Sequence, residues 1–177
     1  MPGQQPYITT ASGKRQFACS PVAVMVFLVN KQEQVLLLAH PDREGGWEPV
    51  SGGLEAGETV LDGALREMRE EVGEEVRAQP LGIVHVWNFH YDENVRYMIS
   101  VGYLMAYEGG EIHPGDDMAG SRYRWWGLDE MKAEKVKVLV PPEGRWFDRA
   151  VELYRLWRGR EMELQPDLSG SVARKPK

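Results

Sequence analysis

The stretch GGLEAGETVLDGALREMREEVGE, from Gly52 to Glu74, decides the fold, because it predicts one helix with four glutamates crowded on one side. Glu67, Glu70, Glu71 and Glu74 follow one another at i, i+3, i+4 and i+7, which makes them neighbours on an α-helix. Like charges at these spacings repel and weaken a helix. A hard divalent cation would turn this repulsion into binding, since Mg²⁺ and Mn²⁺ prefer carboxylate oxygens. A solvated charged face is the alternative interpretation.

Local signals predict where this helix begins and ends. Thr59 stands at the N-cap position, and Asp62 follows three residues later as an acidic variant of the capping box. Gly73 comes directly after the last apolar position and is typical of a helix end. The apolar residues form one stripe, which consists of Leu61, Ala64, Leu65, Met68 and Val72. We therefore expect one face of the helix to pack on a core while the carboxylate face opens toward a cleft.

The same stretch carries a complete motif. Its fixed positions are Gly52, Glu58, Arg66, Glu67, Glu70, Glu71 and Gly73, with Met68 at a bulky apolar position. This pattern resembles the Nudix box, G-x5-E-x7-R-E-U-x-E-E-x-G-U, in which U is a bulky apolar residue. A chance match in this chain has a probability on the order of 10⁻⁶. The one departure is Glu74 at the final U, so we expect either a more exposed helix exit or Val76 in the packing role.

The resemblance implies an enzyme of the Nudix hydrolase family. Such proteins hydrolyse a phosphoanhydride bond in a nucleoside diphosphate linked to another group, by water attack on phosphorus with Mg²⁺ or Mn²⁺ as cofactor. Both the polyphosphate and the glutamate cluster are negative, so bridging cations are needed to bring them together. Two other functions stay open. One is a dihydroneopterin-triphosphate or dinucleoside-polyphosphate pyrophosphohydrolase, and the other is a non-catalytic nucleotide-sensing module, which has no need of the full glutamate set.

The resemblance also assigns roles within the box. Glu67, Glu70 and Glu71 are implied as metal ligands, and the backbone carbonyl of Ser51 or its neighbour Gly52 as a further ligand. Glu67 is either a ligand or the general base that activates the attacking water.

An arginine and a further glutamate complete the implied catalytic set. Arg66 is expected to orient a glutamate through an ion pair, and Glu58 is the expected partner.

Outside the box, basic and aromatic residues are candidates for substrate contact. Arg43 and Arg124 are expected to reach phosphate, and Trp47 to stack on a base. Further candidates are Arg122 for phosphate, Asp116 or Asp117 as an added metal ligand or base, and His85, Trp87, His90 and Tyr97 as residues facing the substrate pocket. Ordinary packing or a solvated turn is the alternative for each of them.

The order of elements predicts an α+β fold. We expect strands over 21–30, 35–39, 76–91, 95–107 and 121–127, an irregular helical region over 128–140, and an amphipathic helix over 144–158. This order fits the Nudix-type αβα sandwich, with a mixed central sheet and a loop–helix–loop catalytic motif. Three regions are expected: a lead-in over 1–18 with a short strand near 7–10, a Nudix domain over 19–160, and a tail over 161–177 with the composition of a disordered segment.

Composition is that of an ordinary globular enzyme. The chain has 177 residues, 42% of them hydrophobic and 27% charged. Its formal net charge of −6 disfavours nucleic acid, so the expected partner is a small nucleotide-like molecule, and a homodimer is left open. Cys19 excludes an intrachain disulfide and is expected to be buried. No apolar run approaches the ~20 residues of a membrane span, and no signal peptide is apparent, so we expect a cytoplasmic location.

Overall fold

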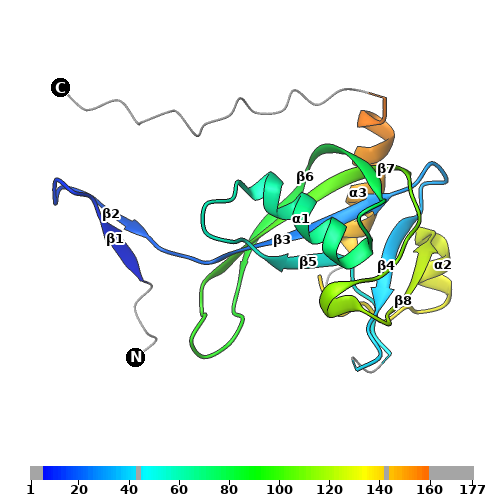
Figure 1. The fold of residues 1–177 in the computed structure, drawn as a ribbon, viewed down its shortest axis with the longest axis horizontal. Helices are drawn as coiled ribbons and strands as arrows, with labels where there is room; N and C mark the ends of the chain where they lie inside the picture. Colours follow the sequence, from blue (N-terminus) through cyan, green and yellow to red (C-terminus); the bar gives the residue numbers. More distant parts are fainter. Residues whose placement is uncertain (1–5, 43–44, 142–143, 160–177) are drawn as a thin grey trace.

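The computed structural model describes residues 6–42, 45–141 and 144–159 and contains a mixed β-sheet between helices (Figure 1). In chain order its elements are β1 (Tyr7–Thr9), β2 (Gln16–Ala18), β3 (Val22–Val29), β4 (Val35–Ala39), β5 (Val50–Gly53), α1 (Val60–Val72), β6 (Arg77–Phe89), β7 (Met98–Gly109), the 3₁₀ turn η1 (Asp116–Met118), β8 (Arg122–Trp126), α2 (Leu128–Ala133) and α3 (Arg145–Trp157). The α+β sandwich expected from the sequence is confirmed.

The main sheet is centred on β3. Its strands lie in the order β6-β7-β3-β4-β8. β5 also pairs with β3 but is not part of this linear order. β3 runs parallel to β7 and antiparallel to β4 and β5, so the sheet is mixed as predicted. β6 and β7 pair antiparallel along most of their length. The predicted strands lie in the right places, although β7 begins three residues later than the expected range 95–107.

Alternate residues of β3 supply two hydrophobic cores, one on each face of the sheet. On the face covered by α1 they are Val24, Val26 and Leu28, which pack with Ala64, Met68 and Val72 of that helix. On the opposite face they are Met25, Phe27 and Val29, which pack with Phe147, Ala150, Val151 and Tyr154 of α3. Since both faces are buried, β3 is a continuous apolar run instead of an alternating one. The predicted apolar stripe of α1 is confirmed.

The limits of α1 follow its local signals. The Thr59 hydroxyl accepts a hydrogen bond from the Asp62 N–H at 3.1 Å, as expected for the N-cap. Gly73 is the C-cap, with a φ of 123° that favours glycine. Glu74 therefore lies beyond the helix and is exposed, so the prediction of four glutamates on one helix face was wrong. Val76 is buried in the core and takes the packing role, because the chain turns back toward the sheet after Gly73.

Three other predictions need correction. The 1–18 region contains a complete hairpin, β1–β2, and not only a short strand. The 128–140 region is helical only over α2, because further along the chain Val138 forms a β-bridge with Trp47. Cys19 is exposed and not buried, because it ends a hairpin that lies outside the main sheet.

The limits of the Nudix domain stay a prediction, and the 161–177 tail lies outside the described residues. Among the residues that the structure describes, no helix has both the length and the apolar character needed to cross a membrane.

Candidate active site

Arg66 is the centre of the box. From the middle of α1 its guanidinium donates to Glu58 Oε1 at 2.8 Å through Nε and to the Gly53 carbonyl at 2.9 Å through Nη2. Its Nη1 donates to Glu67 Oε1 at 2.8 Å and to Glu70 Oε2 at 2.7 Å. One cation therefore holds the carboxylates of Glu58, Glu67 and Glu70 together with the end of β5, and the expected Arg66–Glu58 ion pair is present.

Glu58 fastens the loop before α1 to the helix. Its Oε2 accepts a hydrogen bond from the Glu55 N–H at 2.9 Å, while Oε1 accepts from Arg66. The Arg66 hydrogen bond, assisted by that of Glu55, lowers the pKa of Glu58. In return the hydrogen bond with Glu58 raises the pKa of Arg66, so both groups stay charged. A Cβ at Gly63 would lie 2.7 Å from Leu54, which explains how closely the loop approaches the helix.

The Glu67 carboxylate lies against the backbone of β5 at Gly52. A Cβ added at Gly52 would stand 2.1 Å from Glu67 Cδ, so only glycine allows this approach. The Glu67 side chain is 12% exposed, and Arg66 holds one of its oxygens. The glycine of the motif therefore serves to seat a carboxylate beside the backbone.

Glu71 and Glu70 differ in burial although they are adjacent. Glu71 is 4% exposed, and its Oε2 accepts a hydrogen bond from the Ser51 N–H at 3.1 Å. Ser51 in turn pairs with Met25 of β3, so Glu71 connects α1 to the central sheet. The Glu70 side chain is 36% exposed and faces solvent beside Arg66. The box thus presents carboxylates that range from buried and anchored to exposed and accessible.

The donors of this site fit a hard divalent cation. Within residues 6–42, 45–141 and 144–159, no three His, Cys, Asp or Glu side chains already converge as metal ligands. Instead Arg66 Nη1 occupies the position between Glu67 Oε1 and Glu70 Oε2, where it serves as the shared positive charge. Carboxylate oxygens are the ligands that Mg²⁺ and Mn²⁺ prefer. The neighbouring carboxylates therefore have the chemistry for the expected cofactor.

The predicted substrate residues Trp47 and Arg124 lie at and beside β8, the strand at one edge of the main sheet. Trp47 packs edge-on against Trp126 at 5.2 Å between ring centroids, and the guanidinium of Arg122 lies 5.7 Å from the Trp47 ring. The guanidinium of Arg124 lies 3.9 Å from the Trp126 ring. It also forms ion pairs with two glutamates, Glu130 of α2 and Glu134 after it. Arg43 lies outside the described residues.

The remaining candidates fall into different surroundings. His85 is 5% exposed and stacks on Trp87 at 4.2 Å between ring centroids. His90 and Asp116 are exposed, and Tyr97 is partly buried. The side chain of Asp117 is not among those described.

Sequence reasoning missed two residues near these candidates. Glu48 is a buried carboxylate, 4% exposed, next to Trp47 on the bridge between Leu38 and Glu48. Trp146 of α3 packs on the His85 ring at 4.8 Å between centroids. Glu48 could have been noticed in the sequence as the one charged residue in the segment from Trp47 to Val50. Trp146 and His85 are distant in the sequence, so no local pattern predicts their contact.

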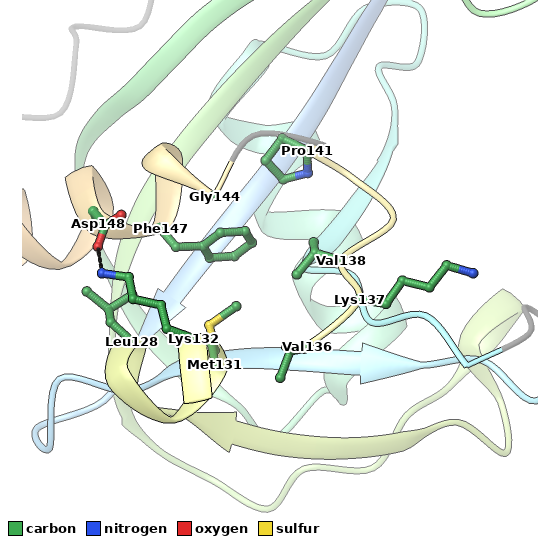
Figure 2. A pocket seen from close by; sticks show the side chains of 10 residues that line it. All are labelled: Leu128, Met131, Lys132, Val136, Lys137, Val138, Pro141, Gly144, Phe147 and Asp148. Carbon is green, nitrogen blue, oxygen red and sulfur yellow. Dashed lines mark hydrogen bonds and ion pairs between the residues drawn. The ribbon is translucent and has the colours of Figure 1, made fainter. Parts of the chain in front are cut away.

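A pocket with apolar walls lies apart from the box. It has a volume of about 350 Å³ and lies between α2, the segment that follows it, and α3 (Figure 2). Met131, Val138 and Phe147 contribute apolar walls, and the Lys132–Asp148 ion pair, 2.8 Å long, closes one side. Phe147 belongs to the core on the α3 face, whereas Arg66 is carried by α1 on the other face. This pocket is therefore not part of the carboxylate site.

Comparison with known proteins agrees with the motif. Residues 20–151 match the family model of the NUDIX domain. The chain belongs to the NUDIX domain family. The resemblance seen in the sequence is thereby confirmed.

Named relatives of this NUDIX chain include the NAD-capped RNA hydrolase NudC of Vibrio parahaemolyticus. The two are 35% identical over 122 residues, which cover 66% of this chain and 41% of the relative. NudC of Pseudomonas aeruginosa is 32% identical over 108 residues, covering 60% of this chain and 36% of the relative. The chain thus spans about two fifths of the length of these relatives. Their names mention RNA, so the expected exclusion of nucleic acid stays a prediction.

Solved structures show the same fold. An ADP-ribose pyrophosphatase from Streptococcus suis superposes with a TM-score of 0.62 at 17% identity, covering 77% of this chain and 93% of the other. The dihydroneopterin triphosphate pyrophosphohydrolase of E. coli superposes with a TM-score of 0.55 at 20% identity, covering 74% and 94%. At such identities the likeness shows the NUDIX fold alone.

Proposed function

We propose that this chain is a divalent-cation-dependent Nudix hydrolase that cleaves a phosphoanhydride bond in a nucleoside diphosphate linked to another group. The observation that carries the proposal is the arrangement around Arg66. Three box carboxylates share one guanidinium, and Glu67 lies against a glycine that has no room for a side chain. Stability of the fold does not require several negative charges to lie so close together beside the backbone of a strand.

Each carboxylate has a role that follows from its setting. Glu70 is the accessible ligand, and Glu71, anchored on the Ser51 N–H, is the rigid one. Glu67 is a ligand or the general base, because its carboxylate is held next to the Gly52 backbone. Bound Mg²⁺ or Mn²⁺ supplies charge neutralisation for the phosphates and lowers the pKa of water. The carbonyl of Ser51 is the proposed further ligand.

Arg66 and Glu58 position the ligands and do not contact substrate in this proposal. Arg66 Nη1 donates to one oxygen of Glu67 and to one oxygen of Glu70, which fixes the two carboxylates relative to each other. Glu58 fixes the Arg66 guanidinium through two hydrogen bonds, to Nε and to Nη2. Pre-ordered ligands lose little conformational freedom when the cation binds, which strengthens binding.

The substrate is proposed as a dinucleotide or nucleotide-like diphosphate such as NAD or ADP-ribose. The names of the NudC relatives and of the Streptococcus suis structure suggest these compounds. On this chain the partly exposed Trp47, with Arg122 beside its ring and Arg124 on the neighbouring Trp126, supports binding of a base and of phosphate. Arg43 remains a proposed phosphate contact.

The test compares two glutamates of the same stretch. Glu70→Gln keeps the shape of the side chain but removes a charged ligand, so Mg²⁺-dependent hydrolysis should fall by several orders of magnitude while the far-UV circular dichroism is unchanged. Glu74→Gln is the matched control, because Glu74 is exposed and lies beyond the helix end. Activity should be measured by product release and metal affinity by calorimetry with Mn²⁺.

Substrates for this test should include NAD, ADP-ribose, NAD-capped RNA, nucleoside triphosphates, dinucleoside polyphosphates and dihydroneopterin triphosphate. Equal activity of Glu70→Gln and the unmodified chain would refute the site. Metal-independent binding of nucleotides without turnover of any of them would instead identify the sensing module.

A further inference from the structure

The end of α1 is bonded to a segment that lies far away in the sequence, the connection over 110–115 between β7 and η1. The Val72 carbonyl accepts a hydrogen bond from the His113 N–H at 2.8 Å, and the Glu71 carbonyl accepts one from the Gly115 N–H at 3.4 Å. The last four carbonyls of a helix have no partner within the helix itself. The 110–115 connection therefore completes the end of the helix that carries Glu70 and Glu71.

The core holds this connection against the helix. Ile112 and, just beyond the connection, Met118 of η1 are buried, and both belong to the core on the α1 face. Met68 and Val72 of α1 are members of the same core. The segment from His113 to Gly115 thus lies between two buried side chains, so its position over the end of α1 is set by packing as well as by backbone hydrogen bonds.

At Gly115 the connection approaches the backbone of α1 closely. A Cβ at Gly115 would stand 2.9 Å from the carbonyl oxygen of Glu70, a backbone atom that cannot rotate away as a side chain can. The φ of −128° at Gly115 is extended backbone that any residue adopts, so space and not conformation requires the glycine. A side chain at this position must therefore displace either the connection or Glu70.

The residues held in this way are the ones that present carboxylates to the proposed cation. The Glu71 carboxylate accepts from the Ser51 N–H at 3.1 Å, and the Glu70 carboxylate accepts from Arg66 Nη1 at 2.7 Å. Ser51 and Arg66 thus fix the two side chains, whereas the 110–115 connection fixes the backbone from which they project. Groups that orient a metal ligand from behind contribute to the affinity of the metal.

We propose that the 110–115 connection positions the metal ligands Glu70 and Glu71, and that Gly115 is a positioning residue of the site. The inference rests on the function proposed above, because it requires a cation on these carboxylates. Contact between the connection and α1 is then linked to cation binding. A change that weakens the contact lowers the cation affinity, and the bound cation stabilises the contact by the same free energy.

The first test compares two glycines by calorimetric titration of the full chain with Mn²⁺. Gly115→Ala should raise the dissociation constant for Mn²⁺ by roughly 10- to 100-fold, the usual effect of losing a group that orients a ligand. Gly127→Ala is the matched control, because Gly127 also has extended backbone before a helix, while its Cβ would meet Glu130 Cβ at an ordinary 3.9 Å. His113→Ala is a second control, since it removes an exposed side chain and keeps the backbone donor.

A positioning role is separated from a structural one by the Mg²⁺ dependence of hydrolysis. For Gly115→Ala the Mg²⁺ concentration that gives half of the maximal rate should rise by a factor similar to that for Mn²⁺, and excess Mg²⁺ should recover activity. Melting temperatures are measured alongside for every variant. A merely structural role would lower the melting temperature of Gly115→Ala and leave its half-saturating Mg²⁺ concentration unchanged.

The second test uses the unmodified chain, so it does not depend on the folding of any variant. Hydrogen exchange of the His113 and Gly115 amides, followed by NMR, should slow when Mg²⁺ is added, because the cation stabilises the contact that protects them. The amide of Asn30 is the control. It donates to the Gln34 carbonyl at 3.0 Å in the turn between β3 and β4, and its exchange should not change.

Three results would overturn the positioning role and leave the proposed function standing. They are equal Mn²⁺ affinity of Gly115→Ala and Gly127→Ala, an effect of His113→Ala as large as that of Gly115→Ala, and amide exchange at His113 that Mg²⁺ does not slow. An unmodified chain that takes up no Mn²⁺ and shows no cation-dependent hydrolysis would instead refute the proposed function, and the positioning role would fall with it.

Discussion

At the scale of single residues, the absence of a side chain at Gly52 determines where the Glu67 carboxylate sits. A Cβ there would lie 2.1 Å from Glu67 Cδ, so Gly52→Ala must displace the carboxylate. Misplacing a catalytic group by about 1 Å can lower the rate on the order of a hundredfold, and we expect a loss of that size in kcat with Mg²⁺. Gly53→Ala is the control, because a Cβ at Gly53 meets nothing within 4 Å. Equal rates for the two variants would contradict the assigned position of Glu67.

His85 is expected to make the stability of the fold depend on pH. Burial first, and then the charge of Arg149, lowers its pKa from 6.5 to about 4. Its ring nitrogens have no hydrogen-bond partner within the described part of the chain. Between these two pKa values the unfolded chain binds a proton that the folded chain does not, so stability is fully present above pH 6.5 and declines as the pH falls toward 4.

The corresponding variant is His85→Phe, which keeps a ring beside Trp87 and removes the titrating group. The melting temperature should be followed for both proteins from above pH 6.5 down to about pH 4. Over this pH interval the melting temperature of the unmodified chain should fall by more than that of the variant. If the melting temperatures of the two proteins fell in parallel as the pH is lowered, groups other than His85 would govern the loss of stability at acid pH.

At the scale of elements, α1 depends on its first turn. The Thr59 hydroxyl accepts from the Asp62 N–H and donates to the Asp62 carboxylate at 2.6 Å, which satisfies an N–H that the helix leaves open. Thr59→Ala should lower the free energy of unfolding by about 1 kcal/mol, measured by urea denaturation. Thr59→Ser retains the hydroxyl and should retain most of the stability. A Ser variant as unstable as the Ala variant would assign the effect to the methyl group instead.

At the scale of the whole molecule, the two cores stand on opposite faces of β3. Leu28 is fully buried on the α1 face, and Leu28→Ala should lower the free energy of unfolding by about 2–5 kcal/mol. Leu156 of α3 is 64% exposed, so Leu156→Ala should change the free energy of unfolding by less than about 0.5 kcal/mol. Both values can be obtained from urea titrations followed by circular dichroism. A small effect at Leu28 would mean that the α1 face contributes little to the fold.

The sequence by itself determined the features that depend on short separations along the chain. The limits of α1 follow from Thr59 and Gly73, and the buried strand β3 from its apolar run, whereas the Arg66–Glu58 pair was implied by the family resemblance. Hydrogen bonds and side-chain contacts over a few residues have nearly fixed geometry in a helix, so residue type and spacing are enough to predict them. For the same reason the family could be recognised from the box.

Tertiary structure alone decided the features that join distant segments. The burial of Glu71 against Ser51 requires β5 to pair with β3, and the contact of the Trp146 ring with His85 requires α3 to pack on β6. The exposure of Cys19 depends on a hairpin that the main sheet does not cover. Strand register and helix placement are set by the packing of all the layers together, and no local pattern of residues contains that information.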